Sequence, residues 1–326
     1  MTVLVTGAAG FIGYHVCEAL LARGEPVLGV DNLFPYYDVN LKKARLAQLE
    51  QRQGFAFCLA DISDQEALSG ALEDRESLRR VVHLAAQAGV RYSLEDPFAF
   101  ARSNLVGHLT VLELCRSLPN LEHLVYASSS SVYGGNPKLP FATDDRVDKP
   151  VSLYGATKNA GELMTRCYSH LFRLPATGLR FFTAYGPWGR PDMAAFKFTR
   201  AILAGEPIHV FNNGDMKRDF TYIDDVVAGV LAVLDEPPMG ENAAPPCRLY
   251  NIGSNRPEPL LRYIAILEEA IGMKAEVEFE PMQPGDIRET CADIGPIQRD
   301  FGFDPKTTIE EGIPRFVEWY RTYYKV

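Results

Sequence analysis

Tyr154 and Lys158 form a Y-x-x-x-K pair within the segment YGATKNAGEL. On a helix, residues four apart lie on one face, so a phenol and an ammonium group would be neighbours. A free tyrosine has a pKa of about 10, but an adjacent positive charge favours the phenolate and lowers that pKa. Such a pair can remove a proton from a substrate hydroxyl. The alternative is an exposed helical pair, because this spacing is common by chance.

Four consecutive serines, Ser128–Ser131, follow the apolar run HLVYA and precede V-Y-G. Serine is a poor residue for the interior of a strand, so the row places hydroxyl groups where a predicted strand ends. Ser129 lies 25 residues before Tyr154. Turn and capping hydrogen bonds are the alternative for the remaining hydroxyls.

The segment VLVTGAAGFIGYHV predicts a strand, a tight turn and a helix. Gly7, Gly10 and Gly13 would let backbone N–H groups approach a pyrophosphate at the helix N-terminus. Asp31 follows at the end of the second predicted strand, where a carboxylate accepts from both adenosine ribose hydroxyls and repels a 2′-phosphate. The sequence therefore predicts NAD rather than NADP. Ile62 and its neighbour Asp61 end the third predicted strand, near the expected place of the adenine ring.

These groups need a scaffold, which the first half of the chain predicts clearly. Apolar runs at 2–7, 25–31, 55–61, 80–85, 123–128 and 176–182 are typical of buried strands. Helical patterns lie between them at 14–24, 39–53, 64–74, 104–118 and 154–172. This alternation predicts βαβ units in an α/β fold with a doubly wound parallel sheet.

From about residue 184 the pattern changes to loops rich in Pro, Gly and Asn, at 184–192, 236–247 and 282–286. We expect a smaller, interrupted α/β domain here that closes over the carboxyl edge of the sheet. The segments 224–234 and 249–254 are predicted to return to the first domain as a helix and a strand. The predicted domains are residues 1–183 with about 222–257, and about 184–221 with 258–326.

Composition excludes several classes of function. A net charge of −9 and a pI near 5.3 argue against nucleic-acid binding. No apolar run reaches transmembrane length, and the first residues do not resemble a leader. The six cysteines lack C-x-x-C spacing and the six histidines lack H-E-x-x-H, so no catalytic metal is expected. Dispersed thiols predict a cytoplasmic protein.

The motifs TGAAGFIG, DN, HLAAQ, SSSSVYG, YGATK, RFFTAYGP, RDFTYIDD, NIGS and PGD occur in this order. They resemble the extended short-chain dehydrogenase/reductase family, in particular its nucleotide-sugar epimerases and dehydratases. The resemblance implies a Rossmann-type domain in which Tyr154 is the catalytic base. It implies that Lys158 orients the base and holds the nicotinamide ribose, and that Ser129 completes a triad. It also implies NAD that stays bound and is recycled in each turnover.

The same resemblance extends the expected cofactor contacts along the chain. We expect these to be Gly7, Gly10, Phe11, Ile12, Gly13, Asp31, Asn32, Asp61, Ile62, Leu84, Ala85, Ala86, Gln87, Asn104, Tyr154, Lys158 and Phe181.

The segments YYDVNLKKARL, AAQAGVRYS, RFFTAYGPWGRPDMA and KRDFTYIDD are most similar to bacterial and plant UDP-glucuronate 4-epimerases. Family dehydratases carry Asp–Glu where this chain has Ser130 and Ser131, and decarboxylases tend to have Glu at the second position. Hydroxyl groups suit the C6 carboxylate of a uronic acid. Thr183 replaces the Asn of glucose epimerases, and Arg190 is a candidate for counter-charge or lid closure.

The nucleotide end of the substrate is expected in the second domain. Arg218 resembles the family arginine that contacts the diphosphate, because a guanidinium fork suits paired oxygens. Asp286 resembles the acceptor for the uridine ribose, and Phe211 is expected to flank the uracil. Arg288 contacts phosphate or is a surface charge. The expected substrate-binding residues are Ser129, Ser130, Ser131, Tyr154, Thr183, Arg190, Phe211, Arg218, Asp286 and Arg91.

The resulting expectation is 4-epimerisation of UDP-glucuronate to UDP-galacturonate. Oxidation at C4 makes the uronate a β-keto acid, which loses CO2 when its carboxylate bond aligns with the carbonyl π system. Ser130, Ser131 and Thr183 are expected to prevent this alignment. A UDP-glucose 4-epimerase, a UDP-glucuronate decarboxylase and a non-catalytic NAD sensor remain as alternatives. The helices at 104–118 and 154–172 are expected to form a four-helix homodimer interface.

Overall fold

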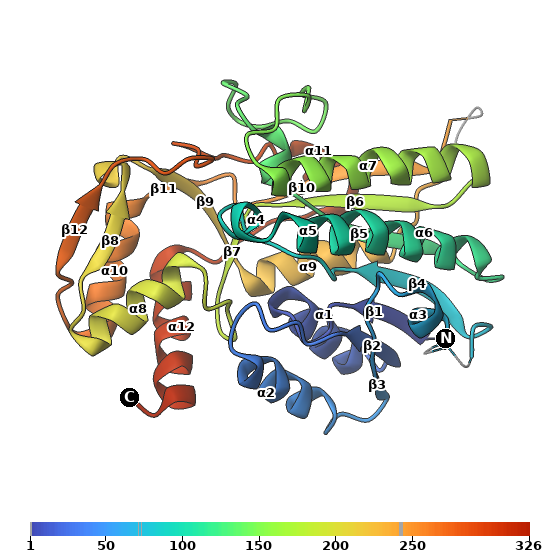
Figure 1. The fold of residues 1–326 in the computed structure, drawn as a ribbon, viewed down its shortest axis with the longest axis horizontal. Coiled ribbons are helices and arrows are strands. Elements are labelled where there is room, and N and C mark those ends of the chain that lie inside the picture. Colours follow the sequence, from blue (N-terminus) through green and yellow to red (C-terminus); the bar gives the residue numbers. More distant parts are fainter. Residues whose placement is uncertain (1, 71, 73, 241–243) are drawn as a thin grey trace.

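The computed structural model describes residues 2–70, 72, 74–240 and 244–326. Its larger part is a seven-stranded sheet in the order β10-β6-β5-β4-β1-β2-β3, in which every neighbouring pair is parallel (Figure 1). The strands are β1 (Thr2–Thr6), β2 (Val27–Asp31), β3 (Phe55–Leu59), β4 (Leu78–His83), β5 (His123–Ser129), β6 (Ala176–Phe181) and β10 (Cys247–Ile252). The predicted fold class is confirmed.

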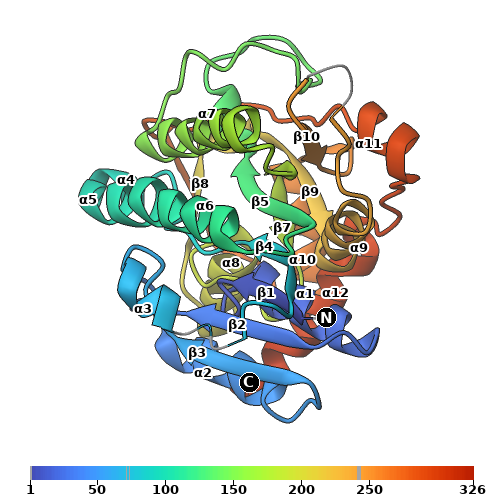
Figure 2. The same ribbon diagram turned by 90° about the vertical axis from the view of Figure 1, so that its right-hand side faces the viewer.

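Helices cover both faces of this sheet (Figure 2). On one face, α1 (Phe11–Ala22) packs against α2 (Val39–Leu49) and α9 (Ile223–Leu234). On the other, α6 (His108–Ser117) packs against α7 (Leu153–Phe172). Two separate clusters of buried apolar side chains fill these faces. Strand β10 extends the sheet at one edge, as the sequence predicted for this segment.

The predicted helix at 104–118 differs in its first turns. The chain forms α4 (Tyr92–Glu95), α5 (Pro97–Phe100) and a π-helix, η1 (Ala101–Gly107), before α6 begins. A π-helical turn is rare and frequently lies at a functional site. Of the predicted helix at 64–74, α3 (Gln65–Gly70) is present, and residues 71 and 73 lie outside the described chain.

The smaller part lies beside the sheet, at the left of Figure 1. It contains the sheets β11-β9-β7 and β12-β8. Its strands are β7 (Thr183–Tyr185), β8 (Ile208–Phe211), β9 (Lys217–Tyr222), β11 (Pro257–Pro259) and β12 (Val277–Glu280). Its helical elements are α8 (Ala194–Ala204), η3 (Asn212–Gly214), α10 (Leu260–Ile271) and α12 (Ile309–Tyr324), whereas α11 (Gly295–Phe301) packs against β10 at the edge of the large sheet. The predicted loop at 184–192 therefore begins as a strand, and residues 241–243 of the predicted loop at 236–247 lie outside the described chain.

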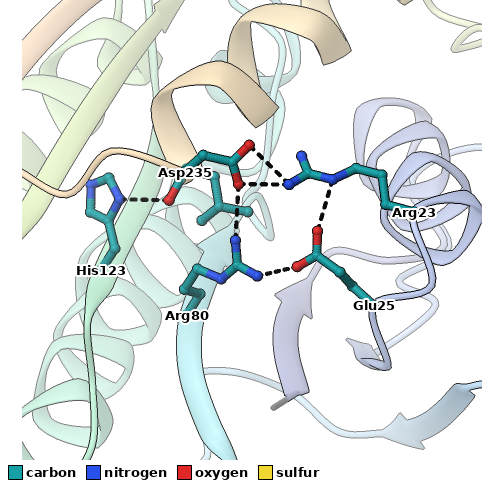
Figure 3. A network of polar contacts seen from close by, with 6 residues as sticks. Arg23, Glu25, Arg80, His123 and Asp235 are labelled. Atoms are coloured by element: carbon teal, nitrogen blue, oxygen red, sulfur yellow. Dashed lines mark hydrogen bonds and ion pairs between the residues drawn. The ribbon is translucent and has the colours of Figure 1, made fainter.

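A ring of opposite charges joins elements at the amino ends of the parallel strands (Figure 3). Arg23, after α1, contacts Glu25 at 2.9 Å and Asp235, after α9, at 2.8 Å. Arg80, in β4, pairs with the same two carboxylates. His123, at the start of β5, shares a hydrogen bond with the Leu234 carbonyl oxygen at 3.2 Å. These contacts link α1, α9, β4 and β5 at the edge opposite the predicted site.

Candidate active site

A cavity of about 830 Å³ lies along the carboxyl ends of the strands. Its wall includes the turn after β1, the end of β5, the first turns of α7 and the segment 181–184 after β6. Residues of the smaller part close the opposite wall, from α8, β8 and the segment 285–290. Because parallel strands point the same way, side chains from distant parts of the chain meet at this edge. The size is that of a small-molecule site.

Tyr154, Lys158 and Ser129 all line this cavity. Ser129 ends β5, and the interaction of its hydroxyl with the Tyr154 phenol lowers the pKa of that phenol. Lys158 lies one helical turn further along α7, where its Nζ donates to the Ala127 carbonyl oxygen at 2.9 Å. The three side chains predicted as a triad are therefore brought together.

The pKa values of this group depend on burial and on neighbouring charges. Burial raises the pKa of Tyr154, while the hydrogen bond with Ser129 and the charge of Arg190 lower it. The sequence prediction assigned this charge effect to Lys158, so Arg190 is an addition from the folded chain. Burial lowers the pKa of Lys158 to about 8, against the opposing effect of Glu162.

The first turn of α7 approaches the serine row closely because residue 155 is glycine. A Cβ at Gly155 would lie 2.4 Å from the Ser131 carbonyl oxygen, a distance that side chains do not tolerate. Ser152 caps the helix by accepting from the Gly155 N–H at 3.0 Å. These contacts fix the distance between Tyr154 and the end of β5.

The four serines divide into two kinds. Ser128 is buried and donates to Glu162, which forms a buried two-point ion pair with Arg180 at 2.9 and 2.8 Å. Ser129 accepts from the Ser131 N–H at 3.2 Å and so caps the short 3-10 helix η2 (Ser130–Tyr133). Ser130 and Ser131 line the cavity, as Ser128 and Ser129 do, and no other role is seen for their hydroxyl groups among the described residues. The row thus combines structural support with hydroxyl groups that face a ligand space.

The turn after β1 has the shape that a pyrophosphate requires. A Cβ at Gly13 would lie 2.0 Å from the Gly7 carbonyl oxygen, so a side chain there would displace the turn from the start of α1. Asp31 lines the same cavity, with Oδ2 accepting from the Ala9 N–H and Oδ1 from the Leu33 N–H. The backbone donors and the carboxylate match the phosphate and ribose of a dinucleotide. The residues present fit NAD.

Most of the other predicted cofactor residues also line the cavity. These are Gly7, Gly10, Phe11, Ile12, Gly13, Asn32, Ile62, Leu84, Ala85, Ala86, Gln87 and Phe181.

Asp61 and Asn104, also predicted as cofactor contacts, lie just outside the cavity wall. Asp61 accepts from Asn32 Nδ2 at 2.8 Å and from Ser63. Asn104 bonds both backbone groups of Gln87 and donates to Thr157 at 3.0 Å. Through these contacts the two side chains hold the lining residues Asn32 and Gln87 in place.

Sequence reasoning missed Lys42 and Asp192. Lys42 lines the cavity beside Asp31 and donates to the Phe34 carbonyl oxygen at 2.7 Å. Asp192 lines it beside Arg190. Lys42 lies in the motif YYDVNLKKARL and Asp192 in GRPD. The spacing within these motifs does not reveal which residue either side chain will contact.

Arg190 lies in the cavity wall together with Thr183. Its Nε donates to Asp192 Oδ1 at 3.0 Å, and its Nη2 donates to Asp192 Oδ2 and to the Ala88 carbonyl oxygen. Tyr36 donates to Asp192 Oδ2 at 3.2 Å. One edge of the guanidinium is therefore fixed by protein contacts, which leaves Nη1 for another acceptor.

The predicted nucleotide residues contact one another across the cavity. The Arg91 guanidinium lies 4.2 Å from the centre of the Phe211 ring and pairs with Asp286 at 3.1 Å. All three line the cavity, and so does Arg218. The Phe211 ring, which was expected to flank uracil, thus carries an arginine in this structure.

Arg218 and Arg288 have different surroundings. Arg218 donates to the Lys217 and Arg288 carbonyl oxygens, and burial lowers its pKa. Arg288 is largely exposed, pairs with Asp215 at 2.8 Å and is not part of the cavity wall. The sequence predicted either a phosphate contact or a surface charge for Arg288, and its exposed position agrees with a surface charge.

The charge of the cavity wall is opposite to that of the whole chain. Seven cationic side chains line it, against four acidic ones, although the protein has a net charge of −9. The cations are Lys42, Arg91, Lys158, Arg190, Lys197, Arg200 and Arg218, and the acids are Asp31, Asp192, Glu206 and Asp286. This surplus of positive charge favours anionic ligands. Within the described ranges, no group of three or more His, Cys, Asp or Glu is arranged to hold a metal ion.

Fold and site together define the class, an NAD-linked enzyme of the short-chain dehydrogenase/reductase type. The sequence model described as "NAD dependent epimerase/dehydratase family" matches residues 3–253, and the chain belongs to this family. The family predicted from the sequence motifs is confirmed.

Curated relatives and solved structures agree with this assignment. The probable UDP-glucuronate 4-epimerase of Rhizobium meliloti strain 1021 is 46% identical over 100% of this chain and 98% of its own length. UDP-glucuronate 4-epimerase 2 of Arabidopsis thaliana is 48% identical over 100% of this chain and 77% of its own length. The crystal structure of UDP-glucuronic acid 4-epimerase from Bacillus cereus with UDP-glucuronic acid and NAD matches with a TM-score of 0.90 at 32% identity, over 99% of this chain and 100% of that chain.

Proposed function

We propose that the protein is a UDP-glucuronate 4-epimerase that converts UDP-glucuronate to UDP-galacturonate with no net redox change. The observation that carries the proposal is the shared cavity. Tyr154 and Ser129 line the same cavity as Ser130, Ser131 and Thr183. Relatives of this name at 46–48% identity over nearly the whole chain support it.

Bound NAD supplies the hydride acceptor for C4 and, once reduced, the donor that returns it. Tyr154 Oη removes the proton from O4 and gives it back after the sugar has turned its other face, while Ser129 holds the hydroxyl in line. The charge of Arg190 favours the phenolate against the effect of burial. With a pKa of about 8, Lys158 is largely protonated at neutral pH.

The C6 carboxylate of the oxidised sugar needs protection, because a β-keto acid loses CO2. That loss breaks the C5–C6 bond and leaves an enolate, which takes up a proton to give a 4-keto-pentose. Ser130, Ser131 and Thr183 donate hydrogen bonds to the carboxylate in this proposal, and Nη1 of Arg190 adds a charge-assisted one. Four donors hold the carboxylate near the ring plane and keep the breaking bond out of alignment with the carbonyl π system.

The remaining site residues divide between the cofactor and the nucleotide. Residues 1–183 with 222–257 hold NAD, and residues 184–221 with 258–326 hold the UDP part of the substrate. Arg218 contacts the diphosphate in this assignment. Arg91 shifts from the Phe211 ring and from Asp286 when uridine enters, because the three contact one another in this structure.

The protein also acts as a homodimer in this proposal. The packed helices α4–α6 and α7 carry large apolar side chains that are exposed. These are Leu94, Phe98, Val106, Leu109 and Leu163, with exposed fractions of 66%, 72%, 50%, 41% and 63%. Two copies of this face would bury them in a four-helix interface.

We also propose that the protein is located in the cytoplasm. None of the six cysteines forms a disulfide, which agrees with a reducing compartment. Among the described residues no helix combines the length and the apolar character needed to cross a membrane.

The decisive experiment is an NMR time course of the purified protein with UDP-glucuronate and no added NAD. Formation of UDP-galacturonate without consumed cofactor is expected. A UDP-pentose product would instead establish the decarboxylase. Conversion of UDP-glucose with untouched UDP-glucuronate would refute the carboxylate contacts, and no conversion of either sugar would favour a sensor.

A further inference from the structure

Arg45 is a fully buried arginine in α2 whose charge is satisfied without a carboxylate contact. Its exposed fraction is 0%. Nη1 donates to the Ala9 carbonyl oxygen at 3.0 Å and to the Tyr37 hydroxyl at 2.8 Å. Nε and Nη2 donate to the Trp188 carbonyl oxygen at 3.1 and 2.6 Å, and Nη2 also donates to Gly189 O at 3.1 Å. All five N–H groups of the guanidinium are used.

These contacts join two segments that the proposed function uses separately. Ala9 belongs to the cofactor turn, and its N–H donates to Asp31 at 3.1 Å. Trp188 and Gly189 immediately precede Arg190, whose guanidinium lines the cavity. One side chain therefore touches both the cofactor turn and the loop that carries the proposed carboxylate contact.

The loop conformation depends on this support. Trp188 has a φ of 60°, a left-handed conformation that a large side chain rarely adopts. Such a conformation persists only when the surrounding structure holds it. Arg45 donates three hydrogen bonds to the carbonyl oxygens of Trp188 and Gly189. His15 shares one more with the Pro187 carbonyl oxygen at 2.9 Å.

We propose that Arg45 is a positioning residue that couples the cofactor turn to the loop bearing Arg190. Displacement of Arg45 moves both segments, so NAD retention and control of the sugar carboxylate change together. The effect on the sugar carboxylate rests on the proposed function. Only the flat, five-donor fork of arginine reaches all four acceptors, because a lysine ammonium presents three donors from one point.

The test compares Arg45→Lys with Arg52→Lys, a control in the turn after α2. Arg52 pairs with Glu18 at 2.8 Å and contacts neither segment. In Arg45→Lys we expect NAD per chain after gel filtration to fall and the fraction of 4-keto-pentose formed from UDP-glucuronate to rise. We also expect kcat/KM to drop roughly 10-fold to 100-fold, the effect of a small displacement in an active site. Arg52→Lys should leave all three unchanged.

Two further measurements keep the inference falsifiable. Tyr37→Phe removes one acceptor of Arg45 and should lower NAD retention in the same direction, even if Arg45→Lys does not fold. The near-UV circular dichroism of Trp188 reports movement of the loop without any turnover. A folded Arg45→Lys protein with normal NAD content, product ratio and near-UV spectrum would overturn the coupling, as would an unchanged Tyr37→Phe protein. If the wild type leaves UDP-glucuronate untouched, the proposed function fails, and NAD content with the near-UV spectrum still decides the coupling.

Discussion

The seven-stranded sheet has charged side chains at both the amino and the carboxyl ends of its strands, but their charges are balanced differently at the two ends. At the amino ends, Arg23 and Arg80 share Glu25 and Asp235 in a ring with two charges of each sign (Figure 3). At the carboxyl ends, cationic side chains outnumber acidic ones around a cavity. A closed ring has no charge left for a ligand, whereas an unequal set attracts one.

The difference shows how a single parallel sheet separates stability from chemistry. At the amino ends, every charge of the ring has a protein partner, so the ion pairs join neighbouring helices and strands and leave no charge free to bind a ligand. Arg218 donates hydrogen bonds to carbonyl oxygens and to Met216 but to no carboxylate of the described residues, so its charge remains available to an anion. The following five predictions test this separation.

Tyr154→Phe should have the largest effect, because it removes the proton carrier from the cavity edge. We expect kcat to fall by about 10³-fold, within the range of general acid–base catalysis. Retained NAD and the thermal midpoint should stay the same. Tyr168→Phe is the control, since this phenol lies on the same helix and bonds Glu113 outside the cavity. Equal activity of the two variants would contradict the assignment of the base.

Acid should weaken the fold through His123 at the opposite edge. Burial lowers the pKa of His123 to about 4, although its bond to Leu234 opposes this. In the unfolded chain the ring binds a proton below about 6.5, so stability falls as the pH drops from about 6.5 to about 4, by about 3 kcal/mol for this group. Urea unfolding between pH 7.5 and 4.5 should show a shallower slope in His123→Gln. Parallel slopes for the two proteins would refute this prediction.

Arg190→Met should impair uronate binding more than chemistry on a neutral sugar. A charge-assisted hydrogen bond contributes about 1.5–3 kcal/mol, so KM for UDP-glucuronate should rise roughly 10-fold to 100-fold. Steady-state kinetics with UDP-glucuronate and UDP-glucose measure the difference. Arg288→Met, which removes an exposed cation outside the cavity wall, is the control. A similar loss with both sugars would show that Arg190 is not selective for the carboxylate.

Thr183→Val should change the product more than the rate. Loss of one hydrogen bond to the carboxylate, worth about 1 kcal/mol, should raise the 4-keto-pentose fraction roughly 5-fold. The NMR time course gives this ratio. Thr199→Val is a suitable control, because its hydroxyl is buried in α8, has no hydrogen-bond partner among the described residues and lies outside the cavity wall. An unaltered ratio in Thr183→Val would remove this residue from the carboxylate contacts.

Asp235→Asn should have the smallest effect and fall on stability alone. Asp235 is partly exposed, and exposed ion pairs contribute about 0–1 kcal/mol. We expect a loss of about 1 kcal/mol in the free energy of unfolding with kcat and KM unchanged. A change in either kinetic constant would show that the two edges are coupled.

Much of the fold and the centre of the site could be predicted from the sequence. The glycine turn, Asp31 and the Y-x-x-x-K pair are short patterns whose geometry follows from one strand end or one helix. The cofactor contacts predicted for Asp61 and Asn104 stay predictions, because both residues lie outside the cavity wall. Asp61 follows β3 and Asn104 lies within η1, and the side chain of each bonds a residue that lines the cavity.

Partners distant in the chain were not predictable. Arg45 reaches Trp188 across 143 positions, and Arg91 stacks on Phe211 from another part of the fold. No local pattern states which carbonyl oxygens or rings will surround a cation.

The sequence by itself determined the class of fold, the NAD preference, the Tyr154–Lys158 pair and the serine row, because strand and helix periods place neighbouring residues in fixed directions. The tertiary structure alone decided which charges are paired and which remain free. It brought Arg190 to Tyr154 and Asp192 to Arg190, and it closed the ring at Asp235. The physical reason is that pairing between distant segments depends on how helices and strands pack. Packing distances of a few ångströms cannot be predicted from any short stretch of sequence.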